Sequence, residues 1–173
     1  MLHYRYHGGN LKQPSYVGFE PSTYKWRSDI NYRDNPQLYR IGKGQQGVLT
    51  CEPYKSEICK HWRFKTPDIA LESSTKILEM FYEYLDVGDF VGADMAKKFL
   101  HMGYTRARRY ANHPSGRKWK NSEGNWEILP LAKDRMESEK ARSANIFYAA
   151  WKEARENKRY LECKNNHRSK YET

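Results

Sequence analysis

Apolar residues recur every three or four positions over three long stretches of the chain, which is the spacing of one buried helix face. Thr66 precedes the first stretch and is a favourable N-cap, and Pro67 suits a first helical turn. Asp89 is expected to cap the second stretch. Glu52-Pro53 opens a shorter pattern of the same kind. We therefore predict four helices, at about 52–62, 67–86, 90–112 and 132–162.

The second long stretch carries two glycines within its apolar stripe. Small residues on a contact face permit a close approach of a neighbouring helix, although Gly103 costs about 1 kcal/mol in helix propensity relative to Ala. Gly103 alternatively marks a kink, or a turn between two shorter helices. The expected buried stripe consists of Gly92, Met95, Ala96, Phe99, Gly103, Ala107 and Tyr110.

Shorter patterns predict β structure. Residues 117–129 predict a hairpin, with Trp119 and Trp126 flanking a turn through Asn-Ser-Glu-Gly. Residues 48–50 indicate a short strand. The expected fold class is mainly α with a small β-hairpin (α+β), as a compact helical domain. The predicted organisation is an aromatic-rich N-terminal arm (1–23) with a short strand at its beginning, a single globular domain (24–162) and a frayed polar C-terminal tail (163–173).

Composition restricts the class of protein. Only 38% of the 173 residues are hydrophobic, but 14% are aromatic, and these large side chains make a core feasible. There are three cysteines, none in C-x-x-C spacing, which argues against a disulfide framework. No apolar run is long enough to span a membrane, and the first residues lack a signal-peptide core. We expect a cytoplasmic protein.

Charge is distributed unevenly along the chain. The net charge is +10, and residues 95–122 contain eight Lys and Arg residues without one acid. Residues 67–94 instead carry seven acids and one lysine. A basic block of this kind favours a polyanionic partner.

The basic block predicts a cationic face on the second long helix, continued by the hairpin. Lys and Arg on such a face would bind phosphates, while Tyr104 or Trp119 would stack on unpaired bases. There are two alternatives. The basic block binds a phosphorylated small ligand, or it pairs with the acidic helix or with an acidic protein. The candidate binding residues are Lys97, Lys98, His101, Tyr104, Arg106, Arg108, Arg109, Arg117, Lys118, Trp119 and Lys120.

A second candidate is the glycine-rich segment RIGKGQQG. Gly42, Gly44 and Gly47, with Lys43 between them, form a candidate phosphate loop, since glycines let backbone N–H groups approach an anion. No clear strand precedes the segment and no helix opens on it, so a purely structural turn is the main alternative.

Metal and catalytic patterns are weak. His3 and His7 lie in a Gly-flanked arm without supporting carboxylates, so we expect no metal site and no cofactor. Asp89 and Asp94 invite a catalytic or ion-binding hypothesis, but helix capping explains Asp89. Neighbouring arginines would disfavour the charged form of His101, as a general base requires; an ordinary surface histidine is the alternative.

Three segments resemble a known protein family: NPQLYRIGKGQQGVLTCEPYKSEI, WRFKTPDIA and VGADMAKKFLHMGYTRARRYANHPSGRKW. They are similar to an uncharacterised domain-of-unknown-function family found in tailed phages, bacteria and fungi, whose members are often labelled "cytoplasmic protein". The resemblance covers about 24–155. It implies an intracellular, single-domain protein, in the host cytoplasm if phage-encoded, and brings no catalytic residue with it.

The leading expectation is a protein that binds DNA or RNA through the basic helix and hairpin. The first alternative is a small enzyme on a phosphorylated or nucleotide substrate, combining residues 42–47 with arginines and Asp89 or Asp94. The second is a phage accessory or assembly protein that binds an acidic protein surface. The sequence leaves the oligomeric state open.

Overall fold

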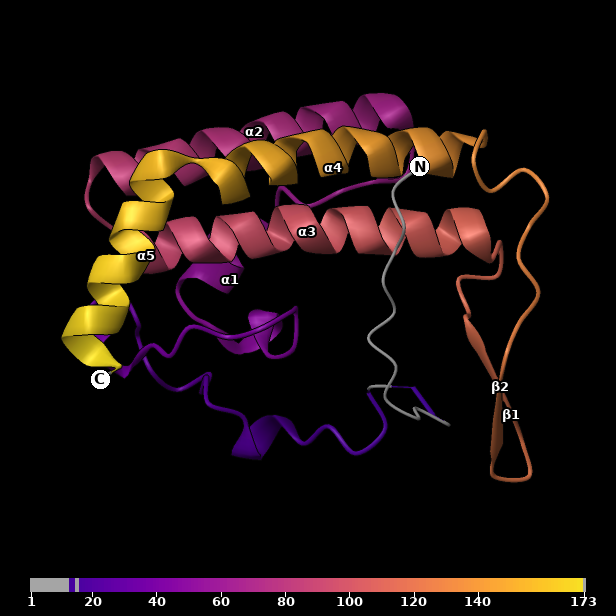
Figure 1. The fold of residues 1–173 in the computed structure, drawn as a ribbon, viewed down its shortest axis with the longest axis horizontal. Helices are drawn as coiled ribbons and strands as arrows, with labels where there is room; N and C mark the ends of the chain where they lie inside the picture. Colours follow the sequence, from indigo (N-terminus) through magenta and orange to yellow (C-terminus); the bar gives the residue numbers. More distant parts are fainter. Residues whose placement is uncertain (1–12, 15, 173) are drawn as a thin grey trace.

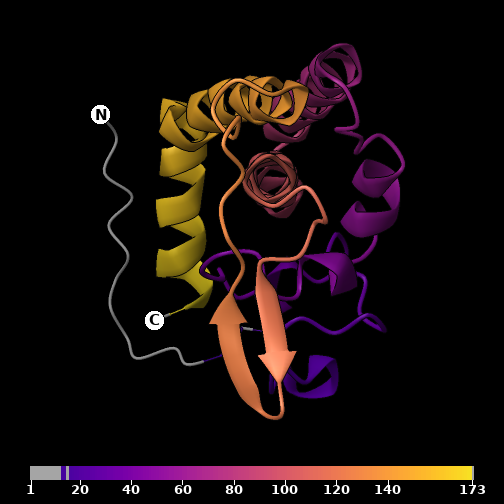
Figure 2. The ribbon, with the colours of Figure 1, turned by 90° about the vertical axis from the view of Figure 1, so that its right-hand side faces the viewer.

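The fold is built around one central helix. The computed structural model describes residues 13–14 and 16–172. Figure 2 looks along the central helix and shows the other helices around it, and Figure 1 shows that it runs antiparallel to the two long helices above it. The helices are α1 (Tyr54–Cys59), α2 (Pro67–Asp86), the central α3 (Phe90–Asn112), α4 (Glu139–Glu156) and α5 (Lys158–Tyr171).

The helix caps predicted from the sequence are confirmed. Thr66 Oγ1 accepts a hydrogen bond from the Ile69 amide at 3.3 Å and begins α2. Asp89 Oδ1 accepts one from the Gly92 amide at 3.0 Å and begins α3. Three residues thus connect α2 to α3, which makes the two helices antiparallel neighbours.

α3 is continuous through Gly103, so the alternative of a turn between two shorter helices at this position is wrong. A Cβ atom built on Gly103 would lie 2.3 Å from a ring carbon of Phe147 on α4, and one built on Gly92 would lie 2.5 Å from Tyr84. Only glycine fits at either position, which confirms the expected close approach of the neighbouring helices.

Residues 16–50 cover the side of α3 that the helices leave open. They form short 3₁₀ turns, at Pro21–Thr23, Pro36–Leu38 and Val48–Thr50. The strand predicted at 48–50 is therefore wrong. Trp26 and Tyr39 are fully buried and stack with ring centroids 5.3 Å apart, anchoring the segment on the core. Most of the predicted N-terminal arm, including its expected strand, lies outside the described residues.

The predicted hairpin is confirmed and lies below the carboxyl end of α3, pointing away from the helices (Figure 1). Strand β1 (Trp119–Ser122) pairs antiparallel with β2 (Asn125–Ile128). The two turn residues, Glu123 and Gly124, both have positive φ angles, 52° and 86°. This is the type I′ geometry that matches the twist of the flanking strands. The chain is mainly α with one small β-hairpin.

The single helix predicted at 132–162 is wrong. Residues 133–137 form turns, and the helix that follows breaks at Asn157, whose backbone is extended (ψ 126°). The Asn157 side chain accepts from the Tyr160 amide at 3.0 Å and caps α5. The frayed tail expected after 163 is instead the second half of α5, and His167 within it is buried, with Nε2 2.9 Å from the Tyr39 carbonyl oxygen.

None of the helices in the described part of the chain is long and apolar enough to cross a membrane.

Candidate functional site

The central position of α3 changes the interpretation of its basic residues. Fourteen of its 23 residues are buried, because other elements surround it. An outward cationic face along its whole length, as the sequence predicted, does not exist. The candidate residues divide into an internal group on the first half of α3 and a second group at its carboxyl end.

Lys98 belongs to the interior. Its side chain is 3% exposed, and Nζ donates hydrogen bonds to the carbonyl oxygens of Gly42 at 2.8 Å and Gly44 at 3.1 Å. Burial lowers the pKa of Lys98 to about 8, and the Asp94 charge offsets part of this effect. The prediction that Lys98 lies on a phosphate-binding surface is therefore corrected: the ammonium group holds the glycine-rich segment against α3.

The glycine-rich segment has the wrong polarity for a phosphate cradle. It turns two carbonyl oxygens toward a buried cation, whereas a phosphate needs N–H groups directed at it. Gly47 has φ +78°, and a Cβ there would lie 2.1 Å from the Tyr24 ring. Lys43 is exposed. The glycines at 42 and 47 are explained by packing against aromatic rings, in agreement with the structural alternative.

Lys97 neutralises a buried carboxylate. Its Nζ lies 3.3 Å from Asp94 Oδ1, and Asp94 also accepts hydrogen bonds from the hydroxyls of Tyr39 and, at 2.6 Å, Tyr160. Burial raises the pKa of Asp94, but the charges of Lys97 and Lys98 and the tyrosine donors outweigh it, and the pKa of the carboxyl lies below its usual value. Asp94 therefore remains an ionised acceptor that joins α3, α5 and the 16–50 segment.

His101 and Tyr104 pack on α4. The His101 ring stacks on Trp151 at 4.1 Å between centroids, nearly parallel at 7°, and Tyr104 lies parallel to Trp151 at 6.1 Å. Burial, followed by the charges of Lys97 and Lys98, lowers the pKa of His101 to about 4. His101 is thus neutral at pH 7 and is not one of the expected phosphate-binding cations.

Arg108 is bonded within the protein. Its guanidinium donates to the Arg135 carbonyl oxygen at 2.7 Å, and burial lowers its pKa. This bond ties the carboxyl half of α3 to the turns before α4. Arg108 therefore supports the fold near the basic surface, and its part in anion binding stays a prediction.

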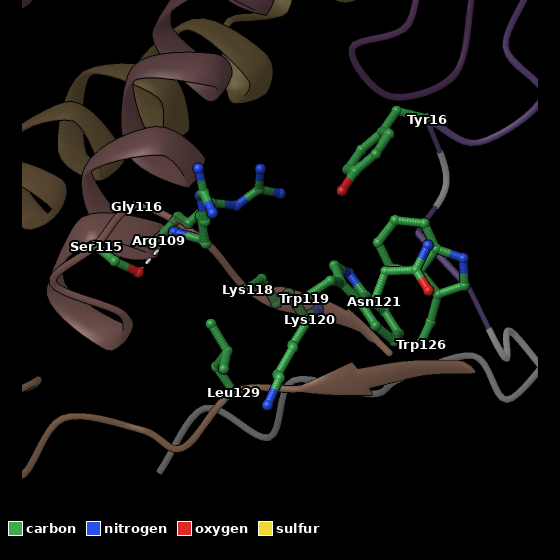
Figure 3. A pocket seen from close by; sticks show the side chains of 11 residues that line it. Tyr16, Arg109, Ser115, Gly116, Lys118, Trp119, Lys120, Asn121, Trp126 and Leu129 are labelled. Carbon is green, nitrogen blue, oxygen red and sulfur yellow. Dashed lines mark hydrogen bonds between the residues drawn. The ribbon is translucent and has the colours of Figure 1, made fainter. Parts of the chain in front are cut away.

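The other candidate residues gather where α3 ends. Figure 3 shows them around a pocket of about 690 Å³ between the end of α3, residues 115–118, the hairpin and Tyr16. We call it the hairpin pocket. Its lining residues are Tyr16, Arg109, Ser115, Gly116, Arg117, Lys118, Trp119, Lys120, Asn121, Trp126 and Leu129. Five of the eleven predicted binding residues are among them, and Arg106 is exposed nearby on α3.

Hairpin register places two indole rings on one face. Trp119 is opposite Ile128 and Asn121 is opposite Trp126, so Trp119 and Trp126 are diagonal neighbours on the same side of the ribbon. The type I′ turn fixes this register, because a shift by one residue would move one indole to the opposite face. Both rings are half-buried and line the pocket.

Tyr16 lines the pocket and was not among the residues predicted from the sequence. It comes from the N-terminal segment, far from the hairpin in sequence, and its ring meets the Trp126 ring edge-on, at 6.4 Å and 89°. Its hydroxyl points into the pocket in Figure 3. Trp126 was assigned to the hairpin but not to the binding site. No local signal in the sequence indicates that these two rings meet.

The pocket is cationic without an acidic counterpart. Arg109, Arg117, Lys118 and Lys120 line it, and among the described residues no Asp or Glu does. Within 13–14 and 16–172, no Asp or Glu forms an ion pair with Arg106, Arg109, Arg117 or Lys120. Arg109 is half-buried, and burial, then the charge of Arg106, lowers its pKa. An anion beside Arg109, Arg117 and Lys120 would therefore meet positive charge that forms no ion pair with a described carboxylate.

The remaining carboxylate candidates are occupied. Asp89 caps α3, accepts from the Tyr54 hydroxyl at 2.7 Å and lies 3.4 Å from Arg33 Nε. Arg33 also forms a two-point ion pair with Glu57, both distances 2.7 Å. These contacts connect α1, α3 and the N-terminal segment. Across the described residues, no three His, Cys, Asp or Glu side chains are placed to bind a metal ion together.

Comparison with known families places the chain in one of them. A family model for a domain of unknown function (DUF4385) matches residues 23–170. The chain belongs to this family. The match includes the end of α5, so the helical carboxyl terminus is part of the family domain rather than an appendage. No curated protein and no solved structure matches the chain.

Proposed function

We propose that this DUF4385 protein binds nucleic acid through the hairpin pocket and the basic surface beside it. The observation that carries the proposal is the composition of the pocket: four cations and three aromatic rings converge there without a carboxylate. Phosphates are recognised by Lys and Arg, and unpaired bases stack on aromatic rings, so this combination suits a nucleic acid.

The distribution of charge supports a polymer as the ligand. Arg106, Arg117 and Lys120 are exposed around the pocket and lack ion-pair partners among the described residues. Each phosphate neutralised by such a cation releases condensed counterions, which gives affinity that falls steeply with salt. The net charge of +10 adds long-range attraction of the same sign.

The enzyme alternative has less support. It combined residues 42–47 with the arginines of α3 and with Asp89 or Asp94 in one pocket. The hairpin pocket contains Arg109 but none of residues 42–47 and no carboxylate. Asp94 is fully buried and accepts hydrogen bonds from two tyrosine hydroxyls. An acidic protein remains the other partner of matching charge, and a parent protein that binds neither DNA nor RNA at low salt would favour it.

We also propose an intracellular setting, as the family resemblance implied. Cys51, Cys59 and Cys163 are all free thiols, which suits a reducing compartment. A nucleic-acid partner is available in the same compartment.

The experiment is a salt-dependent binding assay with DNA and RNA. The double variant Arg109→Ala/Arg117→Ala removes two pocket cations, and Lys60→Ala/Lys152→Ala removes two exposed cations elsewhere, so both lose the same net charge. We expect the pocket variant to lower affinity and to reduce the slope of log K against log salt by about 1 to 2, and the control to change neither appreciably. Equal losses in both variants, or no binding by the parent at low salt, would contradict the proposal.

A further inference from the structure

The aromatic walls of the hairpin pocket specify more than charge. We infer that the pocket takes an unpaired nucleotide, with its base against the indole rings and its phosphate on Arg109 and Arg117. This rests on the proposed function, since it names the form of nucleic acid that the same surface binds. The ligand chemistry is a base with a phosphate, in a single strand or in a free nucleotide.

Three rings from two distant segments form the base-binding part. Trp119 and Trp126 lie on one face of the hairpin, and Tyr16 meets Trp126 edge-on at 6.4 Å. Tyr16 is 57% exposed although it contacts an indole ring, so this aromatic corner is open to solvent. Exposed rings that converge on one cavity cost hydrophobic free energy, which a stacked base would recover.

Stacking of this kind discriminates against duplexes. Bases within a double helix are covered on both faces by their neighbours, so an indole ring can reach only a base that is unpaired or flipped out. The hairpin presents two indoles on the same face as diagonal neighbours, offset by two residues along the ribbon, which suits successive or splayed bases. A duplex would contact only the cations at the rim.

The position of Arg109 supplies the phosphate-binding part. Arg109 is half-buried at the end of α3 and has no carboxylate partner in the described structure, so its charge acts through a medium that screens less than water. Ser115 and Gly116 lie near Arg109 in Figure 3, and Arg117 also lines the pocket. A phosphate bound there would place its attached base toward the hairpin.

The volume of the pocket fits one nucleotide. Small-ligand sites occupy about 300–1,000 Å³, and the hairpin pocket has about 690 Å³. In Figure 3 the Tyr16 ring and the hairpin side chains lie on different sides of the pocket, so a nucleotide bound there would contact both.

The test compares four probes with variants of one ring. The probes are a labelled oligothymidylate of about twelve nucleotides, the matching oligouridylate, a duplex of equal length, and thymidine monophosphate as competitor. Trp126→Ala should weaken binding of the single strands by about tenfold and leave the salt slope unchanged, whereas Trp126→Phe, which keeps a ring, should retain most of the affinity. Tyr16→Ala provides a second variant, at an exposed position, in case Trp126→Ala does not fold; a thermal melt checks folding of each.

The inference is supported if the parent protein prefers single strands to the duplex and if removal of the Trp126 or Tyr16 ring abolishes this preference. Equal affinity for duplex and single strand, insensitive to Trp126 and Tyr16, would overturn it and leave the proposed function standing. If thymidine monophosphate competes as well as the oligonucleotide, the pocket still binds a base with a phosphate. Its ligand is then a free nucleotide rather than a single strand. No binding of any probe at low salt would overturn both this inference and the proposed function.

Discussion

At the scale of single residues, the direction of a side chain decides what its charge does. Lys97 and Lys98 are adjacent in a basic block, yet both serve Asp94 and the interior. Arg117 and Lys120 belong to the same block and are exposed. The run of charge could be predicted from the sequence. Its division into an internal and an external part depends on which elements surround α3, which composition does not encode.

Asp94 tests the internal part. Asp94→Ala should destabilise the protein by about 3–5 kcal/mol, because it leaves two buried tyrosine hydroxyls without their acceptor and the Lys97 charge without its ion-pair partner. Urea unfolding measures this. Asp86→Ala is the matched control: it removes an exposed ion pair to Arg159 and should cost less than about 1 kcal/mol. Similar losses of unfolding free energy in the two variants would contradict the stabilising role assigned to the buried network.

His101 gives a pH test at the same scale. Its pKa in the folded protein is about 4, below the unfolded value near 6.5, so the unfolded chain binds more protons between these pH values. The parent should therefore lose stability as pH falls from about 6.5 to 4, by up to about 3 kcal/mol. His101→Phe keeps a ring on Trp151 and should lack this loss. Parallel stability–pH curves for parent and variant would contradict the assigned environment.

At the scale of elements, the helices that obey simple capping rules were predictable. Thr66 and Asp89 identified the starts of α2 and α3, and the Asn121–Gly124 turn identified the hairpin. The break at Asn157 was not predictable, because Asn is compatible with the interior of a charged helical stretch. Only the extended backbone at this residue shows that the helix ends there. The full set of pocket residues was not predictable for a similar reason, because only the tertiary contact with Trp126 brings Tyr16 to the pocket.

Gly103 tests the close approach of α3 and α4. Helix propensity alone predicts that Gly103→Ala stabilises the protein by about 1 kcal/mol. The overlap with the Phe147 ring, 2.3 Å from the new Cβ, predicts a net loss of about 1–3 kcal/mol instead. Thermal or urea unfolding measures the sign of the stability change caused by Gly103→Ala. Arg106→Ala on the exposed side of the same helix is the control and should change stability little; a more stable Gly103→Ala protein would refute the packing argument.

Asn157 tests the separation of α4 and α5. Asn157→Ala removes the side-chain acceptor for the Tyr160 amide and should cost about 1 kcal/mol, the usual loss for a helix cap. Asn157→Asp retains an acceptor and should restore most of the stability. The comparison by urea unfolding separates the cap from the helix break itself: a continuous α4–α5 helix would gain stability with alanine.

At the scale of the whole molecule, the central position of α3 relocates the basic surface. A helix enclosed by α1, α2, α4, α5 and the 16–50 segment offers polar contacts to a partner mainly at its ends (Figure 2). The hairpin extends one of those ends, and its indole rings complete a pocket with Arg109. We therefore propose the carboxyl end of α3 as the binding surface, away from the α3 face where His101 stacks on Trp151 of α4.

The five tryptophans allow this location to be measured directly. We would follow the indole N–H resonances of the protein by NMR during titration with the single-stranded oligothymidylate at low salt. The account predicts shifts of the Trp119 and Trp126 signals, with Trp26, Trp62 and Trp151, which lie outside the pocket, unchanged. Binding that shifts Trp151 and leaves Trp119 and Trp126 unmoved would contradict the assignment of the site.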